Sequence, residues 1–93
     1  MRQLVLTPKF KRAFRKFVKR NPDLQQRIEE SLQHMEADVF FPNLSTHKLG
    51  GKLDGLHSCS CGYDCRIVFS IEDDTETNSE VIVLLDIGTH DEV

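Results

Sequence analysis

The sequence has little of what marks several common protein classes. Only three of its 93 residues are proline and five are glycine, while 39% are hydrophobic and 29% are charged. This composition differs from that of disordered or collagen-like chains and is typical of a small folded domain. No apolar run approaches the roughly 18 residues that span a membrane, and the first residues do not build a signal-peptide core. We therefore expect one cytoplasmic domain, residues 1–93, with no membrane partner.

Cysteine is also scarce, and its distribution argues against a disulfide framework. The three cysteines, an odd number, fall within seven residues at Cys59, Cys61 and Cys65. Secreted disulfide-rich domains usually have an even number of cysteines. We expect reduced thiols that pack as small hydrophobic side chains, and no cofactor. A zinc site that includes His57 is the weaker alternative, because Cys59 and Cys61 are closer in sequence than the cysteines of a zinc knuckle.

Acidic residues are absent from the first 22 positions, which carry eight lysines and arginines and a charge of +8. The remaining 71 residues carry a charge of −11, so the net charge of −3 conceals a strong separation of sign. Such separation favours a face that binds polyanions. The density of positive charge in this segment exceeds what solubility requires.

The N-terminal part has the pattern of a strand followed by two helices. Residues 3–7 are β-prone, and Thr7-Pro8 is suited to begin a helix, with threonine as N-cap and proline in the first turn. Apolar residues then recur at helical spacing over residues 10–18, and basic residues fill the rest of the surface. Pro22 ends this helix, and a second stripe over residues 24–35 predicts another. The two helices are expected to form an antiparallel hairpin over a sheet.

The rest of the chain is expected to supply most of that sheet. The pattern predicts a loop over residues 38–56 and a β-hairpin with strands at 56–61 and 64–71. A solvated acidic connector at 72–79 and a buried strand at 81–85 are expected to follow. The predicted order is therefore β-α-α-β-β-β. This order defines an α+β fold in which an N-terminal strand and a two-helix hairpin pack on a mostly antiparallel sheet.

One strand of the predicted hairpin carries a candidate anion-binding residue. Arg66 alternates with an apolar row, so its side chain should lie on the opposite face of the sheet, together with Asp64. The register of the partner strand depends on the turn. A simple two-residue turn would place the side chains of His57, Cys59 and Cys61 on the same face as Arg66. A bulge near Gly62 would shift this register by one residue.

Histidines near this hairpin are candidates for proton transfer. His90 follows the buried strand, His47 lies in the loop before the hairpin, and His57 lies in the hairpin itself. His34 is set aside, because it is expected on the polar side of a helix as a surface residue. Imidazole gains or loses a proton near neutral pH, and arginine binds phosphate through two hydrogen bonds. Together with Arg66, these groups suit cleavage of a phosphodiester without a metal. The sequence has no glycine-rich phosphate loop, GxSxG elbow or HExxH motif.

Four segments carry a pattern that is specific only in combination, at residues 7–14, 46–56, 61–69 and 86–93. Together they resemble the RelE/ParE superfamily of toxins from bacterial type II toxin–antitoxin systems, and most closely its YafQ-like mRNA interferase branch. The resemblance implies a microbial-RNase-like fold and cleavage of mRNA in the ribosomal A site without a metal. Two positions depart from the family pattern, because Cys65 replaces an aromatic residue and Ser60 replaces the hairpin histidine.

The resemblance also implies roles for individual residues. His90 is expected to act as general acid, and Asp64 or His47 as general base. Arg66 is expected to stabilise the transition state formed when the mRNA 2′-hydroxyl attacks the adjacent phosphorus. Contacts with mRNA and ribosomal RNA are expected from basic residues of the first helix and of the loop before the hairpin, namely Lys9, Arg12, Arg15, Lys16, Lys19, Arg20, Lys48 and Lys52.

A cognate antitoxin is the expected protein partner, in a toxin–antitoxin hetero-oligomer. An acidic, partly helical antitoxin segment would cover the basic groove or displace the His90 end. Two alternative functions share this fold, a non-enzymatic ParE-like inhibitor of DNA gyrase and a decayed toxin that retains only antitoxin binding. The presence of His90 and Asp64 favours the nuclease, because a purely binding toxin needs no proton-transfer groups.

Overall fold

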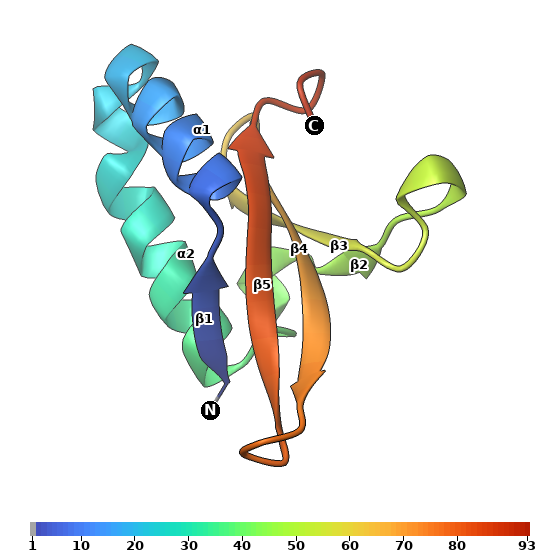
Figure 1. The fold of residues 1–93 in the computed structure, drawn as a ribbon. Helices are drawn as coiled ribbons and strands as arrows, with labels where there is room; N and C mark the ends of the chain where they lie inside the picture. The colour runs from blue at the N-terminus through green and yellow to red at the C-terminus, as the bar shows by residue number, and fades with distance from the viewer. Residues whose placement is uncertain (1) are drawn as a thin grey trace.

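The computed structural model describes residues 2–93 and contains two helices packed on one face of a five-stranded sheet (Figure 1). This arrangement confirms the predicted α+β class. Within the described residues, no helix is long and apolar enough to cross a membrane. The helices and strands are, in chain order, β1 (Gln3–Leu6), α1 (Pro8–Arg20), α2 (Gln25–Ala37), β2 (His47–Lys48), β3 (His57–Gly62), β4 (Cys65–Asp74) and β5 (Ser79–Gly88). Single-turn 3-10 helices lie at Pro22–Leu24, Pro42–Leu44 and Gly51–Leu53.

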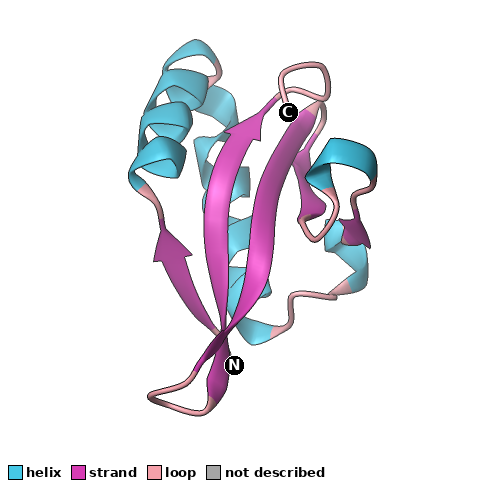
Figure 2. Cartoon of the chain, turned by 45° about the vertical axis from the view of Figure 1, so that its right-hand side comes forward, coloured by secondary structure: helices cyan, strands magenta, loops and turns pink. Residues whose placement is uncertain are grey.

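The sheet has the strand order β1-β5-β4-β3-β2 (Figure 2). β1 runs parallel to β5, and the other neighbouring pairs are antiparallel, as predicted. The strand β2 lies inside the segment 38–56, which the sequence pattern predicts to be a loop. That prediction is wrong for β2, because a strand of two residues leaves no periodic signal. β2 places His47 opposite Ser58 of β3.

The helix α1 begins and ends where the sequence predicts. The Thr7 hydroxyl accepts a hydrogen bond from the amide of Phe10 at 3.1 Å and donates one to the carbonyl of Leu84 at 2.7 Å. A side-chain N-cap of this kind stabilises a helix by about 1 kcal/mol. At the other end, the Asn21 side chain donates to the carbonyl of Phe17 at 3.1 Å. Both ends of α1 are therefore fixed, and the first is tied to β5.

The core lies between the helices and the sheet. Buried residues of α1 and α2 pack there with residues of β3, β4 and β5, namely Phe10, Phe17, Ile28, Met35, Cys59, Ile67, Phe69, Ile82 and Leu84. Full burial of one such large apolar side chain stabilises the fold by roughly 1.5–3 kcal/mol. Because side chains alternate along β4, burial of Ile67 and Phe69 under the helices turns Arg66 to the opposite face.

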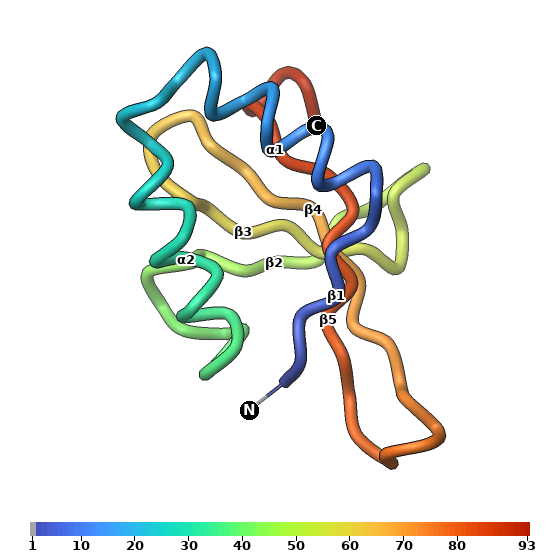
Figure 3. The backbone as a smooth tube through the Cα atoms, turned by 60° about the vertical axis from the view of Figure 1, so that its left-hand side comes forward, coloured from blue at the N-terminus to red at the C-terminus, as the bar shows by residue number. Residues whose placement is uncertain are grey.

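β4 and β5 form a longer hairpin than the sequence predicts. The acidic segment 72–79 is expected to be a connector, but β4 continues to Asp74 and β5 begins at Ser79. The expectation is wrong because backbone pairing between the two strands continues although their side chains are exposed. Figure 3 shows the tip of this hairpin extending beyond the rest of the sheet.

Cys61 and Cys65 form a disulfide bond, so the prediction of three reduced thiols is wrong. A bulge before Gly62 brings the Cα atoms of the two cysteines to 5.1 Å, within the range of disulfide bonds. With two of its ligands oxidised, the zinc alternative is also wrong. Cys59 is the free thiol, and its Sγ lies 3.8 Å from Sδ of Met35 in the core. Burial raises the pKa of Cys59 to about 12.

Candidate functional site

A pocket of about 290 Å³ opens beside the sheet face that the helices leave uncovered. It is lined by residues from β2, β3 and β4, from the turn between β3 and β4, and from the C-terminal loop 89–93. The four residues predicted to be catalytic, His47, Asp64, Arg66 and His90, all line this pocket. Three serines line it as well, namely Ser45, Ser58 and Ser60. The fold therefore brings together side chains from separate parts of the sequence.

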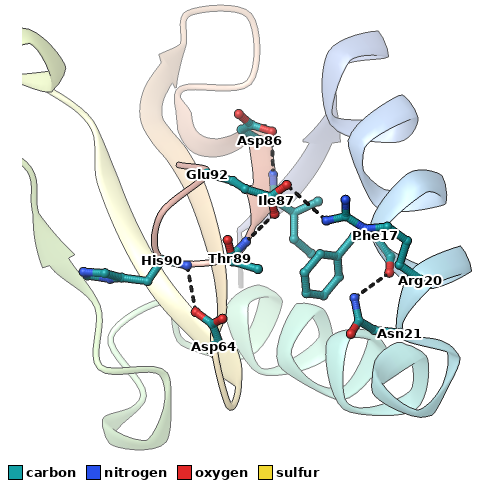
Figure 4. A network of polar contacts seen from close by, with 9 residues as sticks. All are labelled: Phe17, Arg20, Asn21, Asp64, Asp86, Ile87, Thr89, His90 and Glu92. Carbon is teal, nitrogen blue, oxygen red and sulfur yellow. Dashed lines mark hydrogen bonds and ion pairs between the residues drawn. The ribbon is translucent and has the colours of Figure 1, made fainter.

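The turn between β3 and β4 is joined directly to the C-terminal loop. The main-chain amide of His90 donates a hydrogen bond to Oδ1 of Asp64 at 2.9 Å (Figure 4). Asp64 has a φ of 50°, in the left-handed region, which aspartate and asparagine tolerate better than most residues. In Figure 4 the His90 imidazole points away from the helix that carries Arg20. The hydrogen bond thus fixes the His90 backbone, while the exposed ring stays accessible.

The imidazole of His47 has a polar partner at each nitrogen. Nδ1 lies 3.0 Å from the carbonyl oxygen of Ser45, and Nε2 lies 3.2 Å from Oγ of Ser58. Because a carbonyl oxygen only accepts hydrogen bonds, Nδ1 carries the proton and donates it. In the neutral ring, Nε2 therefore accepts a hydrogen bond from the Ser58 hydroxyl. The basic nitrogen of neutral His47 is Nε2, next to a serine that lines the pocket.

The register of the β3–β4 hairpin is that of the bulged alternative. A shift between Ser60 and Gly62 pairs Ser60 with Arg66 and puts Ser58 on the same face. The simple-turn alternative is wrong. It would have placed His57, Cys59 and Cys61 on this face, whereas the structure places Ser58 and Ser60 there. Sequence reasoning missed Ser58 as a site residue. The signal that could have found it is its alternation with Ser60 once the bulge is assumed.

Arg66 lies on β4 between Ser60 of β3 and Gly88 of β5. Across the described part of the chain, Arg66 makes no ion pair. The half-buried guanidinium is therefore available for two parallel hydrogen bonds to an anion such as a phosphate.

His57 lies outside the pocket. Its ring stacks on Phe69, with ring centroids 5.6 Å apart. Burial lowers the pKa of His57, and the nearby Lys48 and His47 lower it further. Its buried Nδ1 has no hydrogen-bond partner among residues 2–93. His57 is therefore a neutral packing residue at neutral pH.

The predicted RNA contacts are exposed, but acids engage two of them. Nζ of Lys9 lies 3.6 Å from Asp86, and the guanidinium of Arg20 lies 3.1 Å from Glu92. No ion pair within the described residues involves the other six, which are Arg12, Arg15, Lys16, Lys19, Lys48 and Lys52. Among the predicted RNA contacts, those free of ion pairs thus lie on α1 and in the segment 48–52.

Several solved structures that share this fold are bacterial toxins. The E. coli DinJ–YafQ toxin–antitoxin complex contains a chain that matches with a TM-score of 0.76 at 12% identity, covering 99% of this chain and 96% of that one. A YoeB/ParE toxin from Agrobacterium tumefaciens matches with a TM-score of 0.74 at 14% identity, covering 95% of this chain and 98% of that one. A copper-bound mutant toxin from Helicobacter pylori matches with a TM-score of 0.68 at 25% identity, covering 100% of this chain and 99% of that one. The chain therefore shares its fold with these solved bacterial toxins.

The sequence places the chain in one family within this class. Residues 2–93 match the family model described as bacterial toxin of type II toxin–antitoxin system, YafQ. The chain belongs to the YafQ family, which confirms the resemblance drawn from its motifs. A comparison with curated protein sequences found no match.

Proposed function

We propose that this YafQ-family toxin is a ribosome-dependent endoribonuclease that inhibits translation, acting in the cytoplasm as a single domain of residues 1–93. The observation that supports this proposal is the position of His47, Asp64, Arg66 and His90 around one open pocket. These residues supply the proton-transfer groups and the fixed cation that cleavage of RNA by its own 2′-hydroxyl needs. In this proposal the side chains perform the reaction without a metal ion or a cofactor.

The reaction begins when the 2′-hydroxyl loses its proton and its oxygen attacks the adjacent phosphorus. His47 is the favoured base, because its Nδ1 donates to Ser45 and leaves Nε2 unprotonated. Asp64 is the other candidate, through the carboxylate oxygen that His90 does not occupy. Arg66 donates hydrogen bonds to the charge that develops on the phosphorane oxygens. The His90 imidazolium gives its proton to the 5′-oxygen as the P–O5′ bond breaks, which yields a cyclic phosphate and a 5′-hydroxyl.

The exposed basic face of α1 supports docking on ribosomal RNA. It consists of Arg12, Arg15, Lys16 and Lys19, none of which forms an ion pair within residues 2–93. Phosphate contacts of this kind bind without sequence specificity and weaken as salt concentration rises. Lys48 and Lys52, near the pocket strands, are the candidates for contacts with mRNA.

A cognate antitoxin is the protein partner that we propose, in a hetero-oligomer with this chain. The similar E. coli toxin was solved in complex with DinJ. The basic face of α1 and the loop around His90 are the surfaces that an acidic antitoxin segment would cover or displace. Co-expression with the product of the neighbouring reading frame tests this partner. A stable complex and restored growth are expected, and the absence of both would contradict it.

Primer extension on mRNA in a translating extract tests the nuclease. The wild-type protein is expected to give discrete cuts in the ribosomal A site. His90→Ala should reduce cleavage by about 10²–10⁴-fold, because the general acid is lost. His34→Ala is the matched control, since His34 is exposed, stacks on Phe41 and does not line the pocket. Equal cleavage by the wild type and by His90→Ala would sink the assignment.

The same extract separates the alternative functions. Intact mRNA together with loss of DNA supercoiling by gyrase would support the ParE-like inhibitor. Intact mRNA with normal supercoiling, while antitoxin binding persists, would support a decayed toxin. The pocket residues favour the nuclease, because neither alternative uses proton-transfer groups at this position.

A further inference from the structure

The C-terminal loop that carries His90 is held from the side of α1 as well as from the side of Asp64 (Figure 4). Oε1 of Glu92 accepts a hydrogen bond from the main-chain amide of Thr89 at 2.9 Å. Oε2 of the same carboxylate accepts a hydrogen bond from the Arg20 guanidinium at 3.1 Å. Glu92 therefore links the last residue of α1 to the residue directly before His90.

Glu92 reaches Thr89 because the loop folds back on the end of β5. The amides of Glu92 and Val93 donate to the carbonyl of Thr89 at 3.1 and 3.3 Å. A Cβ atom added at Gly88 would lie 3.1 Å from Oε1 of Glu92 and 3.3 Å from Cγ1 of Val93. The absence of a side chain at Gly88 thus leaves the space that the folded-back loop occupies.

The two contacts favour the charged form of Glu92. The amide of Thr89 lowers its pKa below the usual range, and the hydrogen bond from Arg20 lowers it further. At neutral pH, Glu92 is an ionised acceptor with one partner on each oxygen. The backbone at the Arg20 end of this link is fixed, because Asn21 caps α1 and Phe17 is buried in the core.

We propose that Arg20 and Glu92 are positioning residues that hold His90 at the pocket through the main chain of Thr89. This inference rests on the proposed nuclease function, in which His90 protonates the leaving oxygen. A displacement of a reacting group by about 1 Å can cost about 100-fold in rate. Arg20 then acts through Glu92, whereas the sequence alone predicts an RNA contact for it.

Graded variants separate the two contacts of Glu92. Glu92→Gln keeps a carbonyl oxygen for the Thr89 amide but loses the charge that faces Arg20. Glu92→Ala loses both contacts, and Arg20→Gln loses the ion pair from the other side. Asp91→Asn and Lys11→Gln are matched controls that remove one charge each from the same loop and the same helix. Neither control residue has an ion pair or a side-chain hydrogen bond within residues 2–93.

Two measurements are made on each variant. The first is the single-turnover cleavage rate of mRNA on programmed ribosomes at saturating toxin, which does not depend on affinity. We expect a loss of about tenfold for Glu92→Ala, a smaller loss for Glu92→Gln and Arg20→Gln, and wild-type rates for both controls. The second is amide hydrogen exchange of Thr89 and His90 in the free protein, which needs no activity. Both amides should exchange faster in Glu92→Ala.

The outcomes distinguish this inference from the proposed function. An unchanged rate and unchanged exchange in Glu92→Ala, with an active wild type, would overturn the inference alone. An Arg20→Gln variant that cleaves at the wild-type rate at saturating toxin, but more slowly than wild type at subsaturating toxin, would show that Arg20 binds RNA, which also overturns the inference. A wild-type protein that cleaves no mRNA would instead contradict the proposed function, and a positioning role in catalysis would fail with it.

Discussion

Asp64 accepts the main-chain amide of His90 at 2.9 Å, although 26 positions separate them in the sequence. The bond connects the β3–β4 turn to the C-terminal loop, so two of the proposed catalytic residues occupy one rigid unit. It also engages Oδ1, one of the two oxygens with which Asp64 could act as a base. Asp64 therefore has a structural role that must be separated from any chemical one.

Replacement of Asp64 separates these roles. Asp64→Asn keeps an Oδ1 acceptor for His90 and tolerates the left-handed backbone, but it cannot serve as a base. With His47 as the base, we expect Asp64→Asn to cleave within about fivefold of wild type, and Asp64→Ala to lose about 10²-fold because the loop is released. Single-turnover cleavage on ribosomes measures both. Equal and severe losses in the two variants would identify the carboxylate as the base.

Ser58 is expected to hold the His47 ring in position at the pocket. Ser58→Ala removes the hydroxyl 3.2 Å from Nε2, so the ring is then held at Nδ1 alone. We expect cleavage to fall by about tenfold, as for a modest misplacement of a catalytic group. The Nδ1–H tautomer should persist because the Ser45 carbonyl still accepts from Nδ1, so ring ¹⁵N chemical shifts of His47 should change mainly at Nε2. Ser70→Ala, a buried serine on β4 that does not line the pocket, is the control and should leave both readouts unchanged.

The buried thiol of Cys59 predicts a loss of stability at alkaline pH. Its pKa rises from 9.0 to about 12 on folding, because burial penalises the thiolate. The unfolded chain therefore releases this proton at a lower pH than the folded chain does. Above pH 9 the free energy of unfolding should fall by up to about 1.4 kcal/mol per pH unit, until the folded thiol also ionises.

Urea unfolding between pH 8 and 10 measures this effect. Cys59→Ala is the comparison, because it removes the ionising group, and its stability should show a flatter pH dependence. Equal slopes for the two proteins would contradict the burial effect. In the same pH range, iodoacetamide should alkylate Cys59 only after unfolding, since the other two cysteines form the disulfide.

The salt dependence of ribosome binding tests the basic face of α1. Arg12→Gln with Lys16→Gln removes two exposed charges that no acid neutralises within residues 2–93. The slope of log affinity against log salt should flatten by about 0.7 for each contact with single-stranded RNA. Arg27→Gln on α2 removes an exposed charge from the other helix and should leave the slope unchanged. An unaltered slope in the double variant would mean that this face contacts solvent and not ribosomal RNA.

The parts of the fold that the sequence predicts are those with local causes. Thr7 caps α1 because its own side chain reaches the amide of Phe10, three residues away. The apolar stripe of α1 is equally local, and Phe10 and Phe17 are buried as expected. Strand alternation and histidine chemistry made candidates of His47, Asp64, Arg66 and His90. Their individual roles came from the resemblance to a family, and their placement around one pocket required the fold.

The parts that the sequence does not predict depend on distant partners. The bulge between Ser60 and Gly62 decides which residues face the pocket, and it also allows the disulfide. Either register was consistent with the local pattern, so only the packing of β3 against the core selects one. The pair of Arg20 and Glu92 joins residues 72 positions apart, and no local pattern indicates it.

The long β4–β5 hairpin offers a practical site for attachment. Its tip, between Asp74 and Ser79, projects at the end of the molecule opposite the C-terminal loop (Figure 1). The side chains there are mostly exposed and do not line the pocket. A fluorophore or a short peptide inserted at this tip would therefore report on ribosome and antitoxin binding from a distance, without touching α1 or the loop that carries His90.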